Sequence, residues 1–129
     1  MILEVRYKEG PNYLHVKASG RWEELAVREE IDALRAEADQ RGITRMLFDV
    51  RNMLPPESEM TRIATGQYIA EMLASPFRVA ALAEPEMIDG ITENSAVSQG
   101  ACFKVFADEK AAMDWLSEAT LTDIGDVSI

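Results

Sequence analysis

The sequence predicts a single α/β domain, in which a mixed sheet of about five strands carries helices on both faces. Two near-continuous apolar runs, 45–50 and 77–83, have the pattern of central strands, because such strands meet helices above and below. Amphipathic helical patterns precede and follow the first run. The length of 129 residues corresponds to one domain. We expect this domain to span 1–119.

Two short strands open the chain, and we expect them to pair as an antiparallel hairpin at one side of the sheet. Apolar and polar residues alternate from Leu3 to Tyr7 and again over 13–18, which is typical of half-buried strands. The residues between them, Glu9-Gly10-Pro11-Asn12, are turn formers.

Helices and strands alternate over the rest of the domain. The first helix, predicted over 22–40, carries apolar residues at helical spacing: Val27, Ile31, Leu34 and Ala38. The following elements are strand 45–50, helix 57–73, strand 77–83, a short helical segment from Pro85 to about Val97, strand 102–106 and a helix after Asp108. Lys104 indicates that the last strand lies at a sheet edge. Each strand–helix–strand unit implies parallel strands, whereas the strand order stays open.

The acidic charge is concentrated near the C-terminus. Residues 85–129 hold nine acidic and two basic residues, which account for −7 of the net charge of −10. Such a surface repels phosphate backbones and anionic lipids, so we expect no nucleic-acid partner. Either a basic protein partner or a contribution to solubility would explain this acidic charge. The tail over 120–129 is acidic and lacks periodicity.

Several classes of chemistry leave no mark on the sequence. It has no glycine-rich phosphate loop, dinucleotide fingerprint, cysteine pair or two-histidine spacing, so we predict no cofactor, no metal and no enzymatic activity. Cys102 is the only cysteine, which excludes an internal disulfide and suits a cytoplasmic protein. No apolar segment approaches the ~20 residues that a membrane span needs.

The candidate site is the edge of the sheet where the two central strands end, because open α/β folds place their sites there. The set of candidate residues is Asp49, Arg51, Asn52, Met53, Leu54, Ser58, Met60, Glu84, Met87 and Ile88. Adaptable apolar side chains beside an arginine and an asparagine are typical of a pocket for a small amphipathic or lipid-like ligand, or of a surface for a protein partner. In the simpler alternative, these residues close the end of the core.

Two further hypotheses compete with this binding role. Asp49 and Glu84 lie at or near the ends of the two predicted central strands, so their carboxylates could act together on a substrate or a cation if those strands are neighbours. Both residues also fit a capping role at adjacent turns or helix N-termini. Alternatively, the domain is structural and forms a homo-oligomer through an apolar helix face or an open sheet edge.

Several stretches of the chain fit one known pattern. They are the opening hairpin with Ser19-Gly20-Arg21, Leu47-Phe48-Asp49-Val50-Arg51, Arg78-Val79-Ala80-Ala81-Leu82, Val105-Phe106-Ala107-Asp108-Glu109 and Ala111-Ala112-Met113-Asp114-Trp115-Leu116. Together they resemble small bacterial STAS-like proteins, relatives of the anti-sigma-factor antagonists and of the cytosolic domains of sulfate transporters, some of which are compared with CRAL-TRIO lipid-binding domains. The resemblance implies a STAS-like fold and a non-enzymatic regulatory or binding module.

The regulatory serine of the true antagonists is not reproduced here. Their Asp-Ser-Ser-Gly motif opens the helix after the central strand, and one of its serines is phosphorylated. In this chain the corresponding region, 54–61, contains Ser58 between Glu57 and Glu59. A phosphoserine there would be repelled by both glutamates. We therefore interpret Ser58 as a helix N-cap or first-turn residue.

Overall fold

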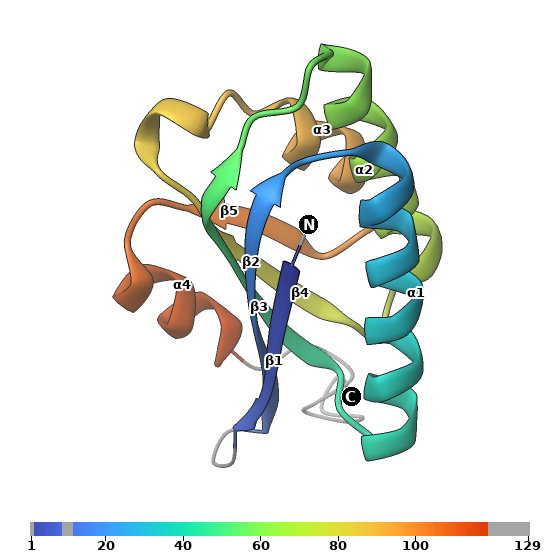
Figure 1. The fold of residues 1–129 in the computed structure, drawn as a ribbon. Coiled ribbons are helices and arrows are strands. Elements are labelled where there is room, and N and C mark those ends of the chain that lie inside the picture. The colour runs from blue at the N-terminus through green and yellow to red at the C-terminus, as the bar shows by residue number, and fades with distance from the viewer. Residues whose placement is uncertain (1, 9–11, 119–129) are drawn as a thin grey trace.

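The structure confirms the α/β fold class. The computed structural model describes the backbone of residues 2–8 and residues 12–118 in full. Its elements are β1 (Ile2–Lys8), β2 (Tyr13–Arg21), α1 (Glu24–Arg41), β3 (Arg45–Leu54), α2 (Glu59–Met72), β4 (Arg78–Leu82), the 3₁₀ helix η1 (Pro85–Met87), α3 (Ile91–Ser98), β5 (Phe103–Phe106) and α4 (Glu109–Leu116) (Figure 1). Most of the predicted turn at 9–12 and the tail over 120–129 lie outside the described residues.

The strands lie in the sheet in the order β1-β2-β3-β4-β5. The pairs β2–β3, β3–β4 and β4–β5 are parallel, and β1 pairs with β2 in the antiparallel direction. The edge position that Lys104 predicts for the last strand is confirmed, since β5 ends this order. The carboxyl ends of four parallel strands therefore share one edge of the sheet.

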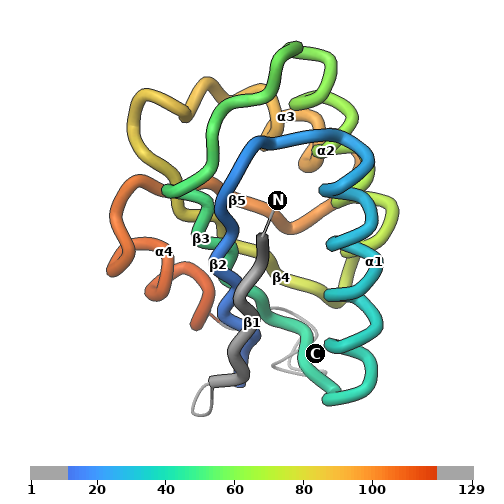
Figure 2. The backbone as a smooth tube through the Cα atoms, in the orientation of Figure 1, coloured from blue at the N-terminus to red at the C-terminus, as the bar shows by residue number. Residues whose placement is uncertain are grey.

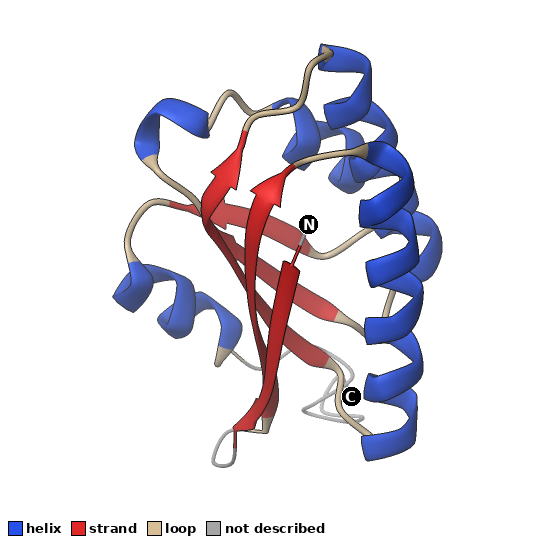
Figure 3. Cartoon of the chain, in the orientation of Figure 1, coloured by secondary structure: helices blue, strands red, loops and turns tan. Residues whose placement is uncertain are grey.

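The helices cover both faces of the sheet (Figure 3). α1, α2 and α3 form a layer on one face, and α4 lies on the other. The core on the α4 face is built from Leu47, Ala80, Leu82, Ala112 and Leu116. The larger core on the opposite face contains Val16, Ile31 and Val79. Within residues 2–8 and 12–118, no helix combines the length and hydropathy required to span a bilayer.

The first helix confirms its predicted buried face but begins later than predicted. Its buried residues are Val27, Ile31, Leu34 and Ala38. The helix starts at Glu24 rather than at residue 22, because Arg21 continues β2 and the Trp22 N–H donates to the Leu54 carbonyl at 3.2 Å. It ends before Gly42, whose φ of 68° lies in the left-handed region that favours glycine.

The prediction that the first central strand ends at Val50 is wrong. β3 continues to Leu54, and the four residues assigned to its exit loop, Arg51, Asn52, Met53 and Leu54, belong to the strand. A register shift between Lys17 and Ser19 of β2 allows the two strands to pair again up to Leu54. The chain consequently leaves β2 and β3 side by side and enters α1 and α2 at the same end of the molecule (Figure 2).

The second helix approaches α3 closely at a small residue, Gly66. Thr65, Gly66, Ile69 and Ala70 are its buried residues, whereas Met60 is 67% exposed. A Cβ atom added to Gly66 would lie 2.5 Å from the Thr92 carbonyl oxygen and 2.6 Å from a side-chain carbon of α3. The backbones of α2 and α3 are therefore in close contact.

On the other face, Arg78 attaches the end of α4 to the sheet. This residue opens β4 and is 8% exposed. Its Nε donates to the Trp115 carbonyl at 2.9 Å, and its guanidinium carbon lies 3.9 Å from the centre of the Trp115 ring. A second guanidinium nitrogen pairs with Glu118 at 3.0 Å. These contacts make Arg78 a structural residue.

Candidate functional site

β3 separates the predicted rim into two sites of opposite chemistry. Successive side chains of a strand point to opposite faces of the sheet. Phe48 and Val50 therefore face α1–α3, where they line an apolar cavity. Asp49 and Arg51 face the α4 side, where they line a polar depression. The predicted single rim is thus two surfaces.

The apolar cavity lies between the sheet and the layer of α1, α2 and α3, and its volume is about 270 Å³. Its wall is almost entirely apolar and includes three of the predicted site residues, Met53, Met87 and Ile88. Ile88 is 36% exposed, so the cavity reaches the molecular surface beside η1. A concave apolar space of this kind, open at one side, is suited to a small ligand.

The cavity exists because the sheet presents small side chains beneath it. Ala18, Ala81 and Ala83 contribute to its wall from β2, β4 and the residue after β4. Larger side chains, Ile31 and Leu34 of α1, face the same space. The helices cannot pack directly on the three alanines without displacing Ile31 and Leu34. Space therefore remains between the sheet and the helix layer.

One arginine connects the elements around the opening. Arg62 of α2 donates to the Met87 carbonyl at 3.2 Å and pairs with Asp89 at 3.3 Å. Its guanidinium carbon also lies 5.0 Å from the centre of the Trp22 ring. The Arg62 side chain is only 14% exposed. It therefore holds the start of α1, α2 and the η1 segment in fixed positions around the opening.

The polar side chains deeper in the wall are also engaged. The Trp22 Nε1–H donates to Thr65 Oγ1 at 2.9 Å, and the Thr65 hydroxyl donates to the Thr61 carbonyl at 2.7 Å. A Glu93 carboxylate oxygen accepts the Val105 backbone N–H at 2.7 Å. These contacts fix the wall and engage the side chains of Trp22, Thr65 and Glu93 in hydrogen bonds.

The polar depression on the α4 side is lined by Lys17, Asp49, Arg51, Asn52 and Glu84. The structure therefore places Asp49 and Glu84 in the lining of one surface depression, as the hypothesis of a shared carboxylate site requires. Among the described residues, no group of three or more histidine, cysteine, aspartate or glutamate side chains could hold a metal ion. A joint action of Asp49 and Glu84 on a substrate or a cation stays a prediction.

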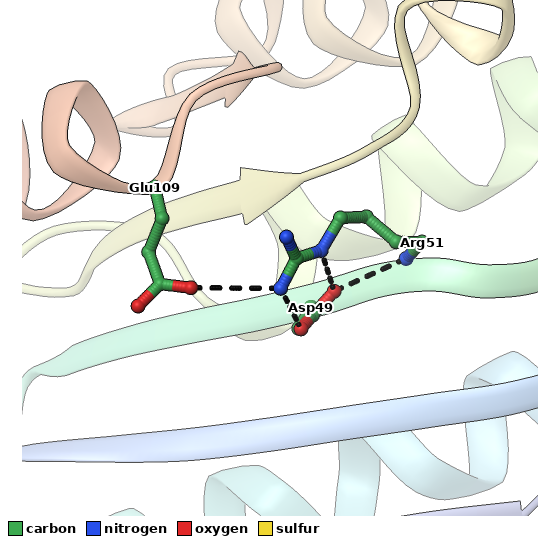
Figure 4. Close-up of polar contacts among 3 residues, drawn as sticks. All are labelled: Asp49, Arg51 and Glu109. Carbon is green, nitrogen blue, oxygen red and sulfur yellow. Dashed lines mark hydrogen bonds and ion pairs between the residues drawn. The ribbon is translucent and has the colours of Figure 1, made fainter.

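An ion pair forms one wall of this depression (Figure 4). Asp49 is 7% exposed, and its two carboxylate oxygens accept from Arg51 Nε at 2.9 Å and from a terminal nitrogen of the same guanidinium at 2.8 Å. The Arg51 backbone N–H also donates to Asp49, at 3.2 Å, and Glu109 lies 3.5 Å from the guanidinium. The side-chain hydrogen bonds from Arg51 lower the pKa of Asp49, although burial acts in the opposite direction.

The remaining predicted residues lie outside both surfaces. Leu54 is 53% exposed and Met60 is 67% exposed, and neither lines the cavity. Ser58 is the N-cap of α2, where its hydroxyl accepts the Met60 backbone N–H at 3.1 Å. The N-cap interpretation of Ser58 is therefore confirmed.

Sequence reasoning missed the residues that complete the cavity, in particular Trp22, Arg62 and Thr92. Trp22 carried a usable signal, because it follows a strand that ends at the same edge of the sheet as β3 and β4. Arg62 and Thr92 lie on helices, and nothing in the sequence distinguishes them from other helical polar residues.

Comparisons with known proteins agree with this architecture. An uncharacterised protein of the DUF3478 family with a SpoIIAA-like fold, from Shewanella loihica PV-4, is 22% identical at a TM-score of 0.59, and the match covers 89% of this chain and 92% of that one. The anti-sigma factor antagonist SpoIIAA in its unphosphorylated form is 16% identical at a TM-score of 0.54, with 88% and 96% covered. No protein-family model and no curated protein sequence matches the chain. The protein has the SpoIIAA-like fold of STAS-like domains.

Proposed function

We propose that this protein is a non-enzymatic binding module that holds a small apolar ligand in the cavity between the sheet and α1–α3. The supporting observation is the cavity itself, whose volume of about 270 Å³ lies between that of a benzene-sized site and those of drug-sized pockets, about 300–1,000 Å³. Its opening beside Ile88 gives a ligand a route from solvent.

The polar depression supports the non-enzymatic part of this proposal. A carboxylate that acts as a general base needs a pKa near the working pH. The pKa of Asp49 is lowered by its hydrogen bonds to Arg51, which makes this carboxylate a weak proton acceptor. The Arg51 guanidinium also neutralises the negative charge of the Asp49 carboxylate, so this carboxylate is a poor ligand for a cation.

A regulatory, protein-binding role is the second candidate. One solved structure with this fold is an anti-sigma factor antagonist, which is a regulatory protein. In this chain, Leu54 and Met60 expose large apolar side chains on either side of the α2 N-cap, Ser58. Exposed apolar residues of this kind favour contact with a partner.

The two tryptophans provide a direct test of the cavity. Trp22 lines it, whereas Trp115 packs with α4 on the opposite face. Titration of isotope-labelled protein with naphthalene should shift the Trp22 indole N–H resonance saturably and leave that of Trp115 in place. The Trp115→Phe variant assigns the two signals.

Two variants locate the binding site. Ala81→Leu adds bulk to the cavity wall and should abolish the shift, while Met60→Ala alters an exposed residue outside the cavity and should preserve it. Saturable binding that survives Ala81→Leu, or no binding at all, would contradict a ligand site in this cavity. A partner protein that binds the wild type and Ala81→Leu but not Met60→Ala would favour the regulatory, protein-binding role.

A further inference from the structure

The cationic groups around the cavity are engaged in other contacts. Arg62 is held by Asp89 and by the Met87 carbonyl, and Glu93 accepts the Val105 N–H. Lys104 also lines the cavity, but its ammonium lies 5.5 Å from the centre of the ring of Phe106, which packs against the core on the α4 face.

A ligand with a carboxylate would therefore find no unengaged cation among the described residues of this wall. Its carboxylate would also meet two acidic residues that line the cavity, Glu30 and Glu93. Moving an unpaired charge out of water costs several kcal/mol even after relaxation of the protein. The wall consequently disfavours anionic molecules.

One polar atom of the wall has no partner. Thr92 lies at the start of α3 and lines the cavity, and its Oγ1 is the buried side-chain nitrogen or oxygen atom that lacks a hydrogen bond within the described part of the chain. A buried hydroxyl without a partner is unfavourable by about 1–3 kcal/mol in proteins generally. Threonine in a helix populates two χ1 rotamers, so this hydroxyl can turn toward the cavity.

The position of Thr92 is also fixed. Its backbone carbonyl lies against Gly66, at the close contact between α2 and α3. The backbone that carries the hydroxyl is therefore held in place, so only the χ1 rotation of Thr92 is lost when a ligand binds to it.

We infer that the cavity takes a compact and mainly apolar molecule that carries no negative charge and has a single hydroxyl or carbonyl oxygen, which hydrogen-bonds to Thr92. This inference rests on the proposed ligand-binding function and adds the chemical class of the ligand. The apolar part of the molecule fills the space above Ala81 and Ala83, and its oxygen satisfies the Thr92 hydroxyl.

Four probes with one ring system test the inference on the full chain. They are naphthalene, naphthol, acetylnaphthalene and naphthoate, with binding measured by calorimetry and by the Trp22 indole resonance. The tighter of the two neutral oxygen-bearing probes should bind about three- to tenfold better than naphthalene, as expected for one added hydrogen bond. Naphthoate should bind at least about tenfold more weakly than naphthalene.

The Thr92→Val variant isolates the hydroxyl. It keeps the shape of the side chain, so it should leave naphthalene affinity unchanged and abolish the advantage of the oxygen-bearing probes. The melting temperature of the free variant should be equal to or higher than that of the wild type, because an unpartnered hydroxyl is removed. Thr44→Val, which lies between α1 and β3 and does not line the cavity, is the matched control.

The outcomes separate this inference from the function on which it rests. Tightest binding by naphthoate, or an oxygen advantage that Thr92→Val leaves intact, would overturn the inference while a cavity-binding function stands. Failure of all four probes to shift the Trp22 resonance would overturn the binding function and the inference together.

Discussion

The two faces of β4 are packed differently, although adjacent residues of one strand form them. Ala80 faces α4 and is completely buried among larger side chains. Ala81 faces the layer of α1–α3 and lines a cavity. The face with three helices is therefore the open one, and the face with a single eight-residue helix is closed. The number of covering helices does not determine how well a sheet face is filled.

The difference follows from what each helix contacts. α4 places Ala112 and Leu116 directly on the sheet, and Arg78 fixes its end. On the other face, α2 and α3 approach each other closely at Gly66. Helices that pack against each other cannot also follow every hollow of the sheet beneath them, so the space over Ala81 remains.

Removal of Arg78 should have the largest effect on the closed face. We expect Arg78→Ala to lower the free energy of unfolding by about 3 kcal/mol, because it removes the packing on Trp115 and leaves the carbonyl of that residue without its donor. Urea denaturation measures this change. Lys110→Ala, on an exposed ion pair of the same helix, should leave the free energy of unfolding almost unchanged. Equal effects of the two variants would contradict the anchoring role of Arg78.

Enlargement of the two alanines compares the faces directly. Ala80→Leu should destabilise the protein by about 2 kcal/mol, because the closed face has no room for three more carbons. Ala81→Leu should stabilise it by about 1 kcal/mol, because the new side chain fills the cavity. Thermal unfolding of both variants gives the comparison. Equal destabilisation by the two would show that the α1–α3 face is as tightly packed as the other.

The Asp49–Arg51 pair should give the closed side a pH dependence. The folded-state pKa of Asp49 lies below its unfolded-state value of about 3.9, so its stabilisation is complete above that value and is lost as the pH falls through the lower folded-state pKa. We expect Asp49→Asn to cost about 1 kcal/mol at neutral pH, since Arg51 is partly exposed. The difference from the wild type should vanish in strongly acidic solution. A constant difference across the acid range would contradict this assignment.

The contact between Arg51 and Glu109 should contribute least to the free energy of unfolding. Glu109 lies 3.5 Å from Arg51, and its side chain is 58% exposed. Solvent screens such a pair, so Glu109→Gln should change the free energy of unfolding by less than about 0.5 kcal/mol. Chemical denaturation beside Asp49→Asn provides the measurement. A cost equal to that of Asp49→Asn would mean that the two carboxylates hold Arg51 equally.

Periodicity predicted those parts of the fold that depend on which residues face the core. The four-residue stripe from Val27 to Ala38 and the buried run of β4 are examples, because burial itself selects their composition. The predicted end of β3 was wrong because the pairing resumes after a register shift and continues to Leu54. In this shift β3 uses one residue more than β2, and such an irregularity depends on how the two strands pair rather than on a local sequence pattern.

The candidate site was predicted only in part for a similar reason. The sequence indicated the correct edge of the sheet, and Met53, Met87 and Ile88 do line the cavity. It could not separate Met53 from Asp49 and Arg51, because simple alternation would place all three on one face. The irregular pairing between Asp49 and Asn52 instead moves Met53 to the opposite face. A cavity also arises where side chains from distant parts of the chain fail to fill the space between the sheet and the helices. No local sequence pattern records this.

The hydrogen bond between Glu93 and the Val105 N–H has a consequence for assembly. β5 ends the sheet, and an open strand edge is a template to which another chain can add. Here a carboxylate from α3 occupies a donor on that edge. An incoming strand would have to displace this negative charge and leave it without its hydrogen bond, so the border beside β5 is protected against fibril-like growth.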